Sequence, residues 1–327
     1  MKVLFYSSKS YDKQYFNIAN KTHTLRFIES ALSQETVNLI TDEEAICIFV
    51  NDLVNATVVE LLHQKGIKII ALRCAGFNNV DLVACKKYDI KVVRVPAYSP
   101  YAVAEHAVAL LQTLNRKIHK AYNRVREGNF SLEHLDGFDL HGKTVGVIGT
   151  GHIGQIFSTI MLGFGCKLLA YDPQPIPELI SKGVEYVTLD ELFSKSDIIS
   201  LHCPLNEHTH YIINEKSLAL MKEHVFIINT GRGGHIDTKA IIEYLKNGKI
   251  GGLALDVYEQ ESELFFTDHS SEIIKDEILT RLMTFPNVLI TSHQGFFTKE
   301  ALSQIAQITL QNISDIETNS ICNNSLV

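Results

Sequence analysis

Three polar side chains in the second half of the chain have the types that proton transfer on an anionic substrate requires. Arg232 stands in INTGRGG, Glu261 in LDVYEQE and His293 in LITSHQG, each at or just beyond the carboxyl end of an apolar, strand-like run. Ligands of open α/β sheets bind at that edge. Histidine is an acid or a base near neutrality, a nearby carboxylate orients its ring, and arginine binds carboxylates through paired hydrogen bonds. The set therefore predicts chemistry on a small anionic carbonyl compound.

Each of these residues has a plainer interpretation when it is taken alone. A lone histidine such as His293 is more often structural, and Glu261 could be a solvated loop charge. Arg232 is harder to dismiss, because the glycines on both sides of it allow the backbone to lie against a ligand. The prediction therefore depends on whether the three side chains converge.

The glycine turn GTGHIG, Gly149–Gly154, predicts a dinucleotide site. It follows the strand-like KTVGVI and precedes the helix-like Ile153–Gly163, so its glycines permit a tight turn and a close approach to a pyrophosphate. The helix N-terminus would offer unpaired N–H groups to the phosphates. Asp172, at the end of the next strand, suits the ribose hydroxyls of NAD and would repel the 2′-phosphate of NADP. An ordinary strand–turn–helix with a surface aspartate is the alternative; the combined spacing favours NAD and hydride transfer.

Composition narrows the class of protein. A chain of 327 residues is long enough for two domains, and its hydrophobic content of 46% is that of a globular protein. A net charge of −7 argues against nucleic acid or an acidic membrane as the main partner. The apolar core of MKVLFYSS is too short for a signal peptide, and we expect a cytoplasmic protein.

The cysteines and histidines do not predict a metal site. Six cysteines form no CxxC pair and several stand in apolar runs, which is typical of free buried thiols in a reducing compartment. His202, Cys203, His208 and His210 could be drawn as a zinc site, but their spacing matches no usual ligand pattern. We expect no metal.

The first hundred residues alternate strand and helix patterns, which implies a parallel sheet covered on both faces. The predicted strands are Lys2–Ser7, Ala45–Val50, Ile67–Leu72 and Lys91–Val95, and the predicted helices are Ala56–Gln64 and Val80–Tyr88. The proline-bounded segment Pro96–Pro100 would cross between domains, and a long helix would follow from Tyr101 to about Arg126.

A second α/β series begins after Gly142. Its predicted strands are Thr144–Ile148, Lys167–Tyr171, Asp197–Leu201, Val225–Asn229, Gly251–Asp256 and Val288–Thr291. Glu261–Pro286 would be a loop or short-helix insertion, and the helix from Thr298 to about Ile316 would return to the first lobe. The expected fold class is therefore α/β, with two Rossmann-like or flavodoxin-like parallel-sheet domains, 1–99 plus 299–327 for substrate and 100–298 for NAD, and an active-site cleft between them.

The order of the motifs resembles the NAD-dependent D-2-hydroxyacid dehydrogenases along essentially the whole chain. The matching segments are GTGHIG, HCPL, NTGRGG, DVYEQE and SHQGF. Within that family, ALRCAGFNNVDL and VVRVPAYSPYAVAEHA are most similar to the fermentative D-lactate dehydrogenases.

The resemblance implies a role for each candidate residue. His293 would give its proton to the keto oxygen of pyruvate, Glu261 would hold and charge the ring, and Arg232 would bind the substrate carboxylate and carbonyl. Further substrate contacts would come from the backbone of Ala75 and Gly76, the hydroxyl of Tyr98, and the rings of Phe49 and Phe296.

The resemblance also implies how NAD binds. The cofactor residues would be Gly149, Gly151, His152, Ile153 and Gly154 at the pyrophosphate, Asp172 at the ribose, Cys203 and Pro204 near the adenine, Thr230, Gly231 and Arg232 at the nicotinamide, and Asp256 near its carboxamide. Thr209 is added to this set, although some close relatives carry asparagine there. A homodimer or homotetramer would follow from the family, with the Tyr101–Arg126 helix between subunits; a core helix would have the same pattern.

Several rival functions have distinct signatures. A formate dehydrogenase would be expected to carry an amide in place of Glu261, and a phosphoglycerate dehydrogenase would need more cations for its phosphate. Another D-2-hydroxyacid dehydrogenase with a different 2-keto acid remains open, because pocket size is not readable. An NAD-responsive binding protein would not need Arg232, Glu261 and His293 together.

Overall fold

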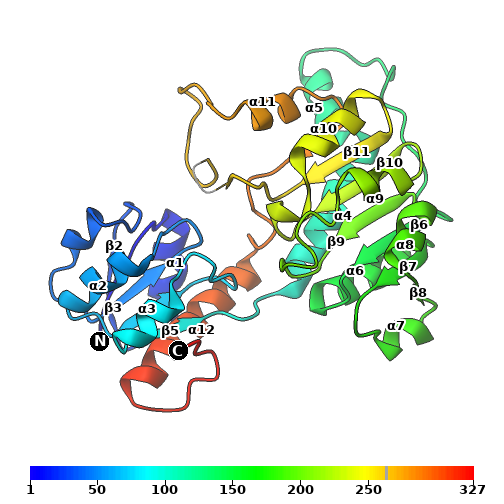
Figure 1. Ribbon diagram of the computed structural model, residues 1–327. Helices are drawn as coiled ribbons and strands as arrows, with labels where there is room; N and C mark the ends of the chain where they lie inside the picture. Colours follow the sequence, from blue (N-terminus) through cyan, green and yellow to red (C-terminus); the bar gives the residue numbers. More distant parts are fainter. Residues whose placement is uncertain (262–263) are drawn as a thin grey trace. The chain divides into compact units, whose positions relative to one another are not determined.

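The computed structural model describes residues 1–261 and 264–327, and it divides the chain into two compact units (Figure 1). Unit 1 combines Met1–Ser99 with Phe296–Val327, and unit 2 is Pro100–Gly295. The strands of both sheets pair in parallel. The predicted class, two parallel-sheet α/β domains, is confirmed. Positions 262 and 263 of the predicted insertion lie outside the described residues.

The sheet of unit 1 has five strands in the order β2-β1-β3-β4-β5. They are β1 Lys2–Phe5, β2 Thr24–Phe27, β3 Ala45–Ile48, β4 Ile69–Leu72 and β5 Lys91–Arg94. β3 and β4 are buried at every residue, which explains why their continuous apolar runs predicted them. The edge strand β2 is not predicted by the sequence pattern, because TLRF is short and only partly buried.

Helices of unit 1 cover its sheet. They are α1 Ser10–Ala19, η1 Thr36–Leu39, α2 Ala56–Gln64, α3 Leu82–Lys87 and α12 Lys299–Glu317. α12 begins where the Thr298 hydroxyl caps the backbone N–H of Ala301, and it packs on α1, β4 and β5. Its buried stripe includes Ile305 and Ile313, as its helical spacing predicts. The last segment of the chain thus completes the core of unit 1.

The sheet of unit 2 has seven strands in the order β12-β11-β10-β9-β6-β7-β8. They are β6 Thr144–Ile148, β7 Lys167–Tyr171, β8 Glu185–Tyr186, β9 Ile198–Leu201, β10 Val225–Asn229, β11 Ile250–Leu255 and β12 Val288–Ile290. The accompanying helices are α4 Pro100–Arg116, α5 Ile118–Arg126, α6 His152–Gly163, α7 Pro177–Ser181, α8 Leu189–Lys195, α9 Glu215–Leu220, η2 Gly233–His235, α10 Thr238–Lys246 and α11 Glu277–Met283. Only the two-residue β8 lacks a counterpart among the predicted strands. The short helix α11 lies in the predicted insertion.

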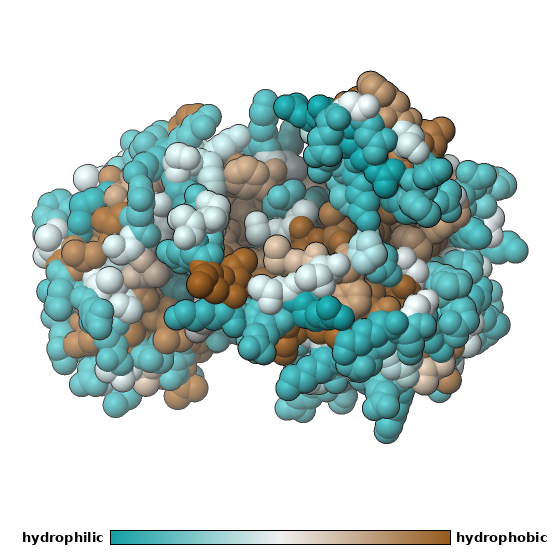
Figure 2. Space-filling view, turned by 90° about the horizontal axis from the view of Figure 1, so that it is seen from above, coloured by the Kyte–Doolittle hydropathy of each residue, from teal (hydrophilic) through white to brown (hydrophobic). Residues whose placement is uncertain are grey.

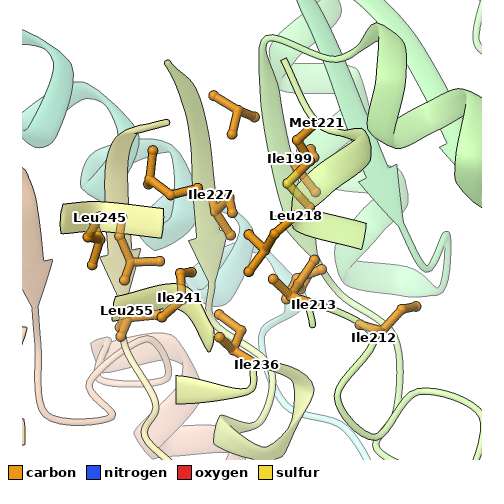
Figure 3. Packing of buried hydrophobic residues seen from close by; sticks show 14 of the residues in the cluster. Ile199, Ile212, Ile213, Leu218, Met221, Ile227, Ile236, Ile241, Leu245 and Leu255 are labelled. Carbon is orange, nitrogen blue, oxygen red and sulfur yellow. The ribbon is translucent and has the colours of Figure 1, made fainter. Parts of the chain in front are cut away.

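The core of unit 2 lies on both faces of its sheet. Ile227 belongs to one buried cluster and its neighbour Ile228 to the other, because successive strand residues point to opposite faces. Figure 3 shows the first cluster, in which Ile227 packs with Ile213, Leu218 and Ile241 from the connecting segments. The two packed faces hold the strand ends, and the loops that follow them, in fixed positions.

The long helix predicted from Tyr101 to about Arg126 is in fact two helices, α4 and α5. Lys117 separates them with φ 50° and ψ 37°, a left-handed conformation that no helix continues through. In α4, Leu110, Leu111 and Leu114 are buried in the core of unit 2. Of the two interpretations of this pattern, the core helix is therefore right for α4. α5 differs, because none of its described residues is buried.

Hydrophilic residues cover most of the face shown in Figure 2, with hydrophobic side chains between them. Among the described residues, no helix combines the length and the apolar character needed to cross a membrane.

Candidate active site

His293 and Glu261 form a hydrogen-bonded pair beyond the carboxyl end of the sheet in unit 2. His293 Nδ1 lies 2.7 Å from Glu261 Oε1, and the other carboxylate oxygen accepts the backbone N–H of Tyr258 at 2.9 Å. Because Nδ1 faces the carboxylate, the other ring nitrogen, Nε2, lies on the opposite side of the imidazole. Phe266 from the insertion packs near the same ring, with centroids 5.9 Å apart. The structure therefore brings Glu261 and His293 together, while the orienting role of Glu261 stays a prediction.

Asp256, directly after β11, holds the turn that carries His293. Its carboxylate accepts the Thr291 hydroxyl and the backbone N–H groups of Gln294 and Gly295, and its backbone carbonyl accepts the N–H of His293 at 2.7 Å. His106 Nε2 lies 3.2 Å from the same carboxylate. Burial works against the charged form, but the hydrogen bonds from His106 and Thr291 outweigh it and keep the pKa of Asp256 below its usual value. His293 itself has φ 52°, so this network stabilises a left-handed backbone conformation.

Arg232 stands in a tightly held turn after β10. Asn229, at the end of that strand, accepts the N–H of Gly231 at 3.0 Å and donates to the carbonyl of Arg232 at 2.9 Å. A Cβ on Gly233 would lie 2.1 Å from the backbone of Tyr258, so only glycine allows this turn to approach the segment that leads to Glu261. β10, β11 and β12 are adjacent. Arg232, Asp256 and His293 therefore follow three neighbouring strands at one sheet edge.

The glycine turn lies between β6 and α6, as predicted. Gly149 has φ 92°, and a Cβ there would lie 2.4 Å from the backbone nitrogen of Cys203. A Cβ on Gly154 would lie 2.0 Å from the carbonyl oxygen of Gly149. Asp172, after β7, accepts the backbone N–H of Thr150 at 2.7 Å through one carboxylate oxygen. The glycine turn and Asp172, the residue predicted to bind the ribose, are therefore in contact.

The loop after β9 contains the other residues predicted near the cofactor. The hydroxyl of Thr209 donates to the carbonyl of Pro204 at 2.6 Å and so closes this loop on itself. His202 is packed against Phe157 and lies 2.9 Å from the hydroxyl of Ser200, and burial lowers its pKa to about 3. A neutral, buried ring of this kind is a structural residue. In the described part of the chain, no group of three or more His, Cys, Asp or Glu side chains is arranged to hold a metal.

Unit 1 brings its predicted substrate residues to the ends of β3, β4 and β5. The ring of Phe296 lies 6.0 Å from that of Phe49 and 6.2 Å from that of Tyr98, measured between centroids. Arg94 donates to the carbonyl of Ala75 at 2.8 Å and so fixes the turn that contains Gly76. Phe49, Tyr98 and Phe296 thus form an aromatic group, and Ala75 and Gly76 form a backbone turn at the same end of the sheet. Such a combination suits a small substrate with a methyl group and a carboxylate.

Comparisons with known proteins agree with this geometry. Residues 108–295 match the family described as D-isomer specific 2-hydroxyacid dehydrogenase, NAD binding domain. The D-lactate dehydrogenase of Escherichia coli (strain K12) is 53% identical over 329 residues, covering 100% of both chains. The apo structure of the Escherichia coli enzyme has a TM-score of 0.93 at 51% identity, again over 100% of both chains.

Two further solved structures are similar to this chain, one named for its substrate and one with bound ligands. The pyruvate reductase of Chlamydomonas reinhardtii has a TM-score of 0.94 at 44% identity and covers 99% of this chain and 98% of its own. The D-lactate dehydrogenase of Aquifex aeolicus, complexed with NAD and lactic acid, has a TM-score of 0.86 at 36% identity over 99% of both chains.

The chain belongs to the D-isomer-specific 2-hydroxyacid dehydrogenases. It is an NAD-dependent oxidoreductase, and the resemblance seen in its motifs is confirmed.

The residues of this 2-hydroxyacid dehydrogenase fit a dinucleotide. Apart from Gly151 itself and its two chain neighbours, no described residue has an atom within 4 Å of a Cβ position on Gly151, so the backbone at the N-terminus of α6 is open to a pyrophosphate. The buried hydroxyl of Thr230 has no hydrogen-bond partner among the described residues, which is the state expected of a group that a ligand satisfies.

The glycines of the dehydrogenase turn should separate stability from cofactor binding. Gly154→Ala is expected to lower Tm by several degrees, because the added methyl group collides with the backbone of Gly149. Gly151→Ala is expected to leave Tm within about 1 °C of the parent but to weaken NADH binding about tenfold or more, because its methyl group projects into open space at the pyrophosphate. Differential scanning fluorimetry and NADH fluorescence titration measure the two effects. Equal losses of Tm in both variants would contradict this division.

Four residues that form hydrogen bonds with Asp256 or Arg232 at this end of the sheet were not among the predicted site residues: His106, Thr291, Asn229 and His235. Asn229 had a readable signal, since it is a polar residue at the end of an apolar strand inside INTGRGG. His106 had none, because its partner Asp256 lies 150 positions further along the chain.

Proposed function

We propose that this dehydrogenase reduces pyruvate to D-lactate with NADH and catalyses the reverse reaction with NAD⁺. The observation that carries the proposal is the 2.7 Å hydrogen bond between His293 and Glu261 on the sheet edge that also holds Arg232. Similar proteins include a D-lactate dehydrogenase and a pyruvate reductase, and this similarity favours pyruvate among the 2-keto acids.

His293 is the proposed proton donor in the direction of pyruvate reduction. Bound NADH supplies the hydride to the carbonyl carbon. The charged ring of His293 donates the Nε2 proton to the keto oxygen, which becomes the hydroxyl of lactate. Glu261 accepts the Nδ1–H throughout, so it keeps the ring oriented and stabilises its charged form before the transfer. In lactate oxidation the neutral ring takes the hydroxyl proton as a base.

Arg232 is the proposed anchor for the substrate carboxylate. Its turn is held by Asn229 and Gly233, so the guanidinium begins from a fixed backbone position. Arginine offers a planar pair of donors that matches a carboxylate and also polarises the carbonyl next to it.

We infer that residues 1–99 with 299–327 act as the substrate domain and that residues 100–298 bind NAD. In the first domain, the N–H groups of Ala75 and Gly76 and the hydroxyl of Tyr98 would bind the carboxylate, and the ring of Phe49 would contact the methyl group. Phe296 lies just before the second part of this domain, within compact unit 1, and its ring would contact the methyl group as well. The aromatic grouping of Phe49, Tyr98 and Phe296 supports this assignment.

The cofactor residues keep their proposed assignments. They are Gly149, Gly151, His152, Ile153 and Gly154 for the pyrophosphate, Asp172 for the ribose, Cys203, Pro204 and Thr209 for the adenine side, and Thr230, Gly231, Arg232 and Asp256 for the nicotinamide side. Asp256 has a second function in this proposal, because its carboxylate already binds the turn of His293. Its replacement would then disturb proton transfer as well as NADH binding.

The proposed function is tested by assaying a panel of 2-keto acids with NADH and with NADPH. The fall in absorbance of the reduced cofactor measures the rate for each pair. The highest kcat/KM is expected for pyruvate with NADH. A higher value for a larger 2-keto acid would make the chain a different D-2-hydroxyacid dehydrogenase. Tight NADH binding without turnover of any 2-keto acid would favour an NAD-responsive binding protein.

We also propose that the chain forms a homodimer or homotetramer through α5. Ile118, Tyr122 and Val125 recur at helical spacing on this helix and are 54%, 60% and 53% exposed. Phe130 and Leu132, just beyond α5, are more exposed still, at 75% and 81%. An apolar surface of this kind on a monomer marks an interaction site, and a second copy of the same surface is its simplest occupant.

Tyr122→Glu is expected to shift the sedimentation coefficient to that of a 36.7 kDa monomer, because it places a charge in the proposed apolar interface. Val83→Glu is the matched control: Val83 is 82% exposed on α3 of unit 1, and its replacement should leave the assembly unchanged. A parent protein that already sediments as a monomer would refute the proposal.

The six free cysteines are consistent with a reducing compartment, and on that basis we propose a cytoplasmic location.

A further inference from the structure

His235 is a fully buried histidine close to Arg232. It ends the short turn η2, three residues after Arg232, and its residue is 0% exposed. Its Nδ1 accepts the backbone N–H of Arg232 at 3.3 Å, and its Nε2 lies 3.7 Å from Sγ of Cys203. The ring therefore lies between two loops, one that carries the proposed substrate anchor and one that carries the proposed adenine contacts.

The backbone of Gly231 packs closely against the ring of His235. A Cβ on Gly231 would lie 3.1 Å from Cε1 and 3.2 Å from Nδ1 of His235, so the imidazole lies directly against the residue before Arg232. On the other side, the buried side chain of Asn229 binds the N–H of Gly231 and the carbonyl of Arg232. Both backbone polar groups of Arg232 are thus bonded to buried side chains, and His235 supplies the bond to its N–H.

The bonding pattern requires one particular form of the ring. Nδ1 must be unprotonated to accept the N–H of Arg232, so the single proton of the neutral ring is on Nε2, facing the loop of Cys203 and Pro204. Burial is the main cause that lowers the pKa of His235 to about 4, and the nearby Arg232 and His210 lower it further, while a hydrogen bond to the Pro204 backbone opposes them. Burial raises the pKa of the Cys203 thiol to about 11. Both groups are neutral at pH 7, which excludes a thiolate–imidazolium nucleophile and leaves a positioning function.

We propose that His235 is a positioning residue with two separable functions: Nδ1 sets the backbone of Arg232 for the substrate carboxylate, and Nε2 holds the Cys203–Pro204 loop for the cofactor. The inference rests on the proposed function of Arg232. The inference assigns a different effect to each ring nitrogen of His235: Nδ1 acts on substrate binding, and Nε2 acts on NADH binding.

Two amide variants test the two nitrogens separately. The oxygen of an asparagine side chain can take the place of Nδ1, whereas the amide of the longer glutamine reaches the place of Nε2. His235→Asn is expected to raise the Kd for NADH about fivefold to tenfold and to leave the KM for pyruvate within about twofold, because the loss is one buried hydrogen bond on the cofactor side. His235→Gln is expected to raise the KM for pyruvate about tenfold and to leave the Kd for NADH within about twofold.

NADH fluorescence titration and steady-state kinetics at saturating NADH provide the two readouts, and Tm shows whether each variant is folded. Equal changes of KM and Kd in both variants, or a fall in Tm with neither constant changed, would overturn the proposal by reducing His235 to a packing residue. If either amide variant does not fold, His235→Leu is measured in its place and should raise both constants. The unmodified protein shows whether a failure concerns His235 or the proposed function. If the unmodified protein does not reduce pyruvate, the proposed function fails, and the kinetics of the variants are repeated with the best 2-keto acid of the panel.

Discussion

His293→Asn is expected to lower kcat for pyruvate reduction about a thousandfold and to leave the Kd for NADH within about twofold, since general acid catalysis contributes roughly a hundredfold to ten-thousandfold. Asparagine is chosen because His293 has φ 52°, and asparagine tolerates the left-handed region better than most residues. The turn held by Asp256 should therefore survive, and only the transferable proton is lost. Single-turnover kinetics with bound NADH measure the chemical step directly.

His224→Asn is the matched control for this variant. His224 has φ 62°, is exposed, and lies just before β10, at the opposite end of that strand from Arg232. The control should retain the activity of the parent protein. A His293→Asn protein that turns over as fast as the control would show that His293 does not donate the proton.

Arg232→Lys is expected to lower kcat/KM for pyruvate by about a hundredfold to a thousandfold, because lysine keeps the charge but loses the paired donors, each charged hydrogen bond contributing about 1.5–3 kcal/mol. The Kd for NADH should change much less, since the backbone of the turn is fixed by Asn229 and Gly233. Steady-state kinetics with pyruvate and NADH titration measure the two quantities.

Arg281→Lys serves as the control for arginine chemistry as such. Arg281 is exposed on α11, where its guanidinium lies 4.9 Å from the ring centroid of Phe285. Its replacement should leave the kinetics unchanged. If Arg232→Lys behaves in the same way as Arg281→Lys, the carboxylate is bound elsewhere.

The strands of this fold could be predicted from the sequence where every residue of the strand is buried. β3 and β4 are buried at every residue, and each appears in the sequence as a continuous apolar run; β9 is equally buried and has one polar residue, Ser200, in its run. The edge strands β2 and β8 are short and partly exposed, so their composition does not differ from that of a loop. The break between α4 and α5 depends on a left-handed Lys117, a residue type with no preference for that conformation.

The grouping of the candidate site residues could be predicted from the sequence for a different reason. Parallel strands place their carboxyl ends at one edge, so Arg232, Asp256 and His293 could be expected to lie near one another before any distance was known. The bonds that hold them could not be read in this way. Whether His235 accepts from Arg232 depends on the path of a three-residue turn, and whether His106 reaches Asp256 depends on how α4 packs on the sheet.

The most direct test of the account is the configuration of the lactate formed from pyruvate and NADH, resolved by chiral chromatography. The arrangement of His293, Glu261 and Arg232 in a member of the D-isomer-specific family predicts D-lactate, formed in a one-to-one ratio with the NADH consumed. L-lactate, a racemic product, or consumption of NADH without lactate would contradict it.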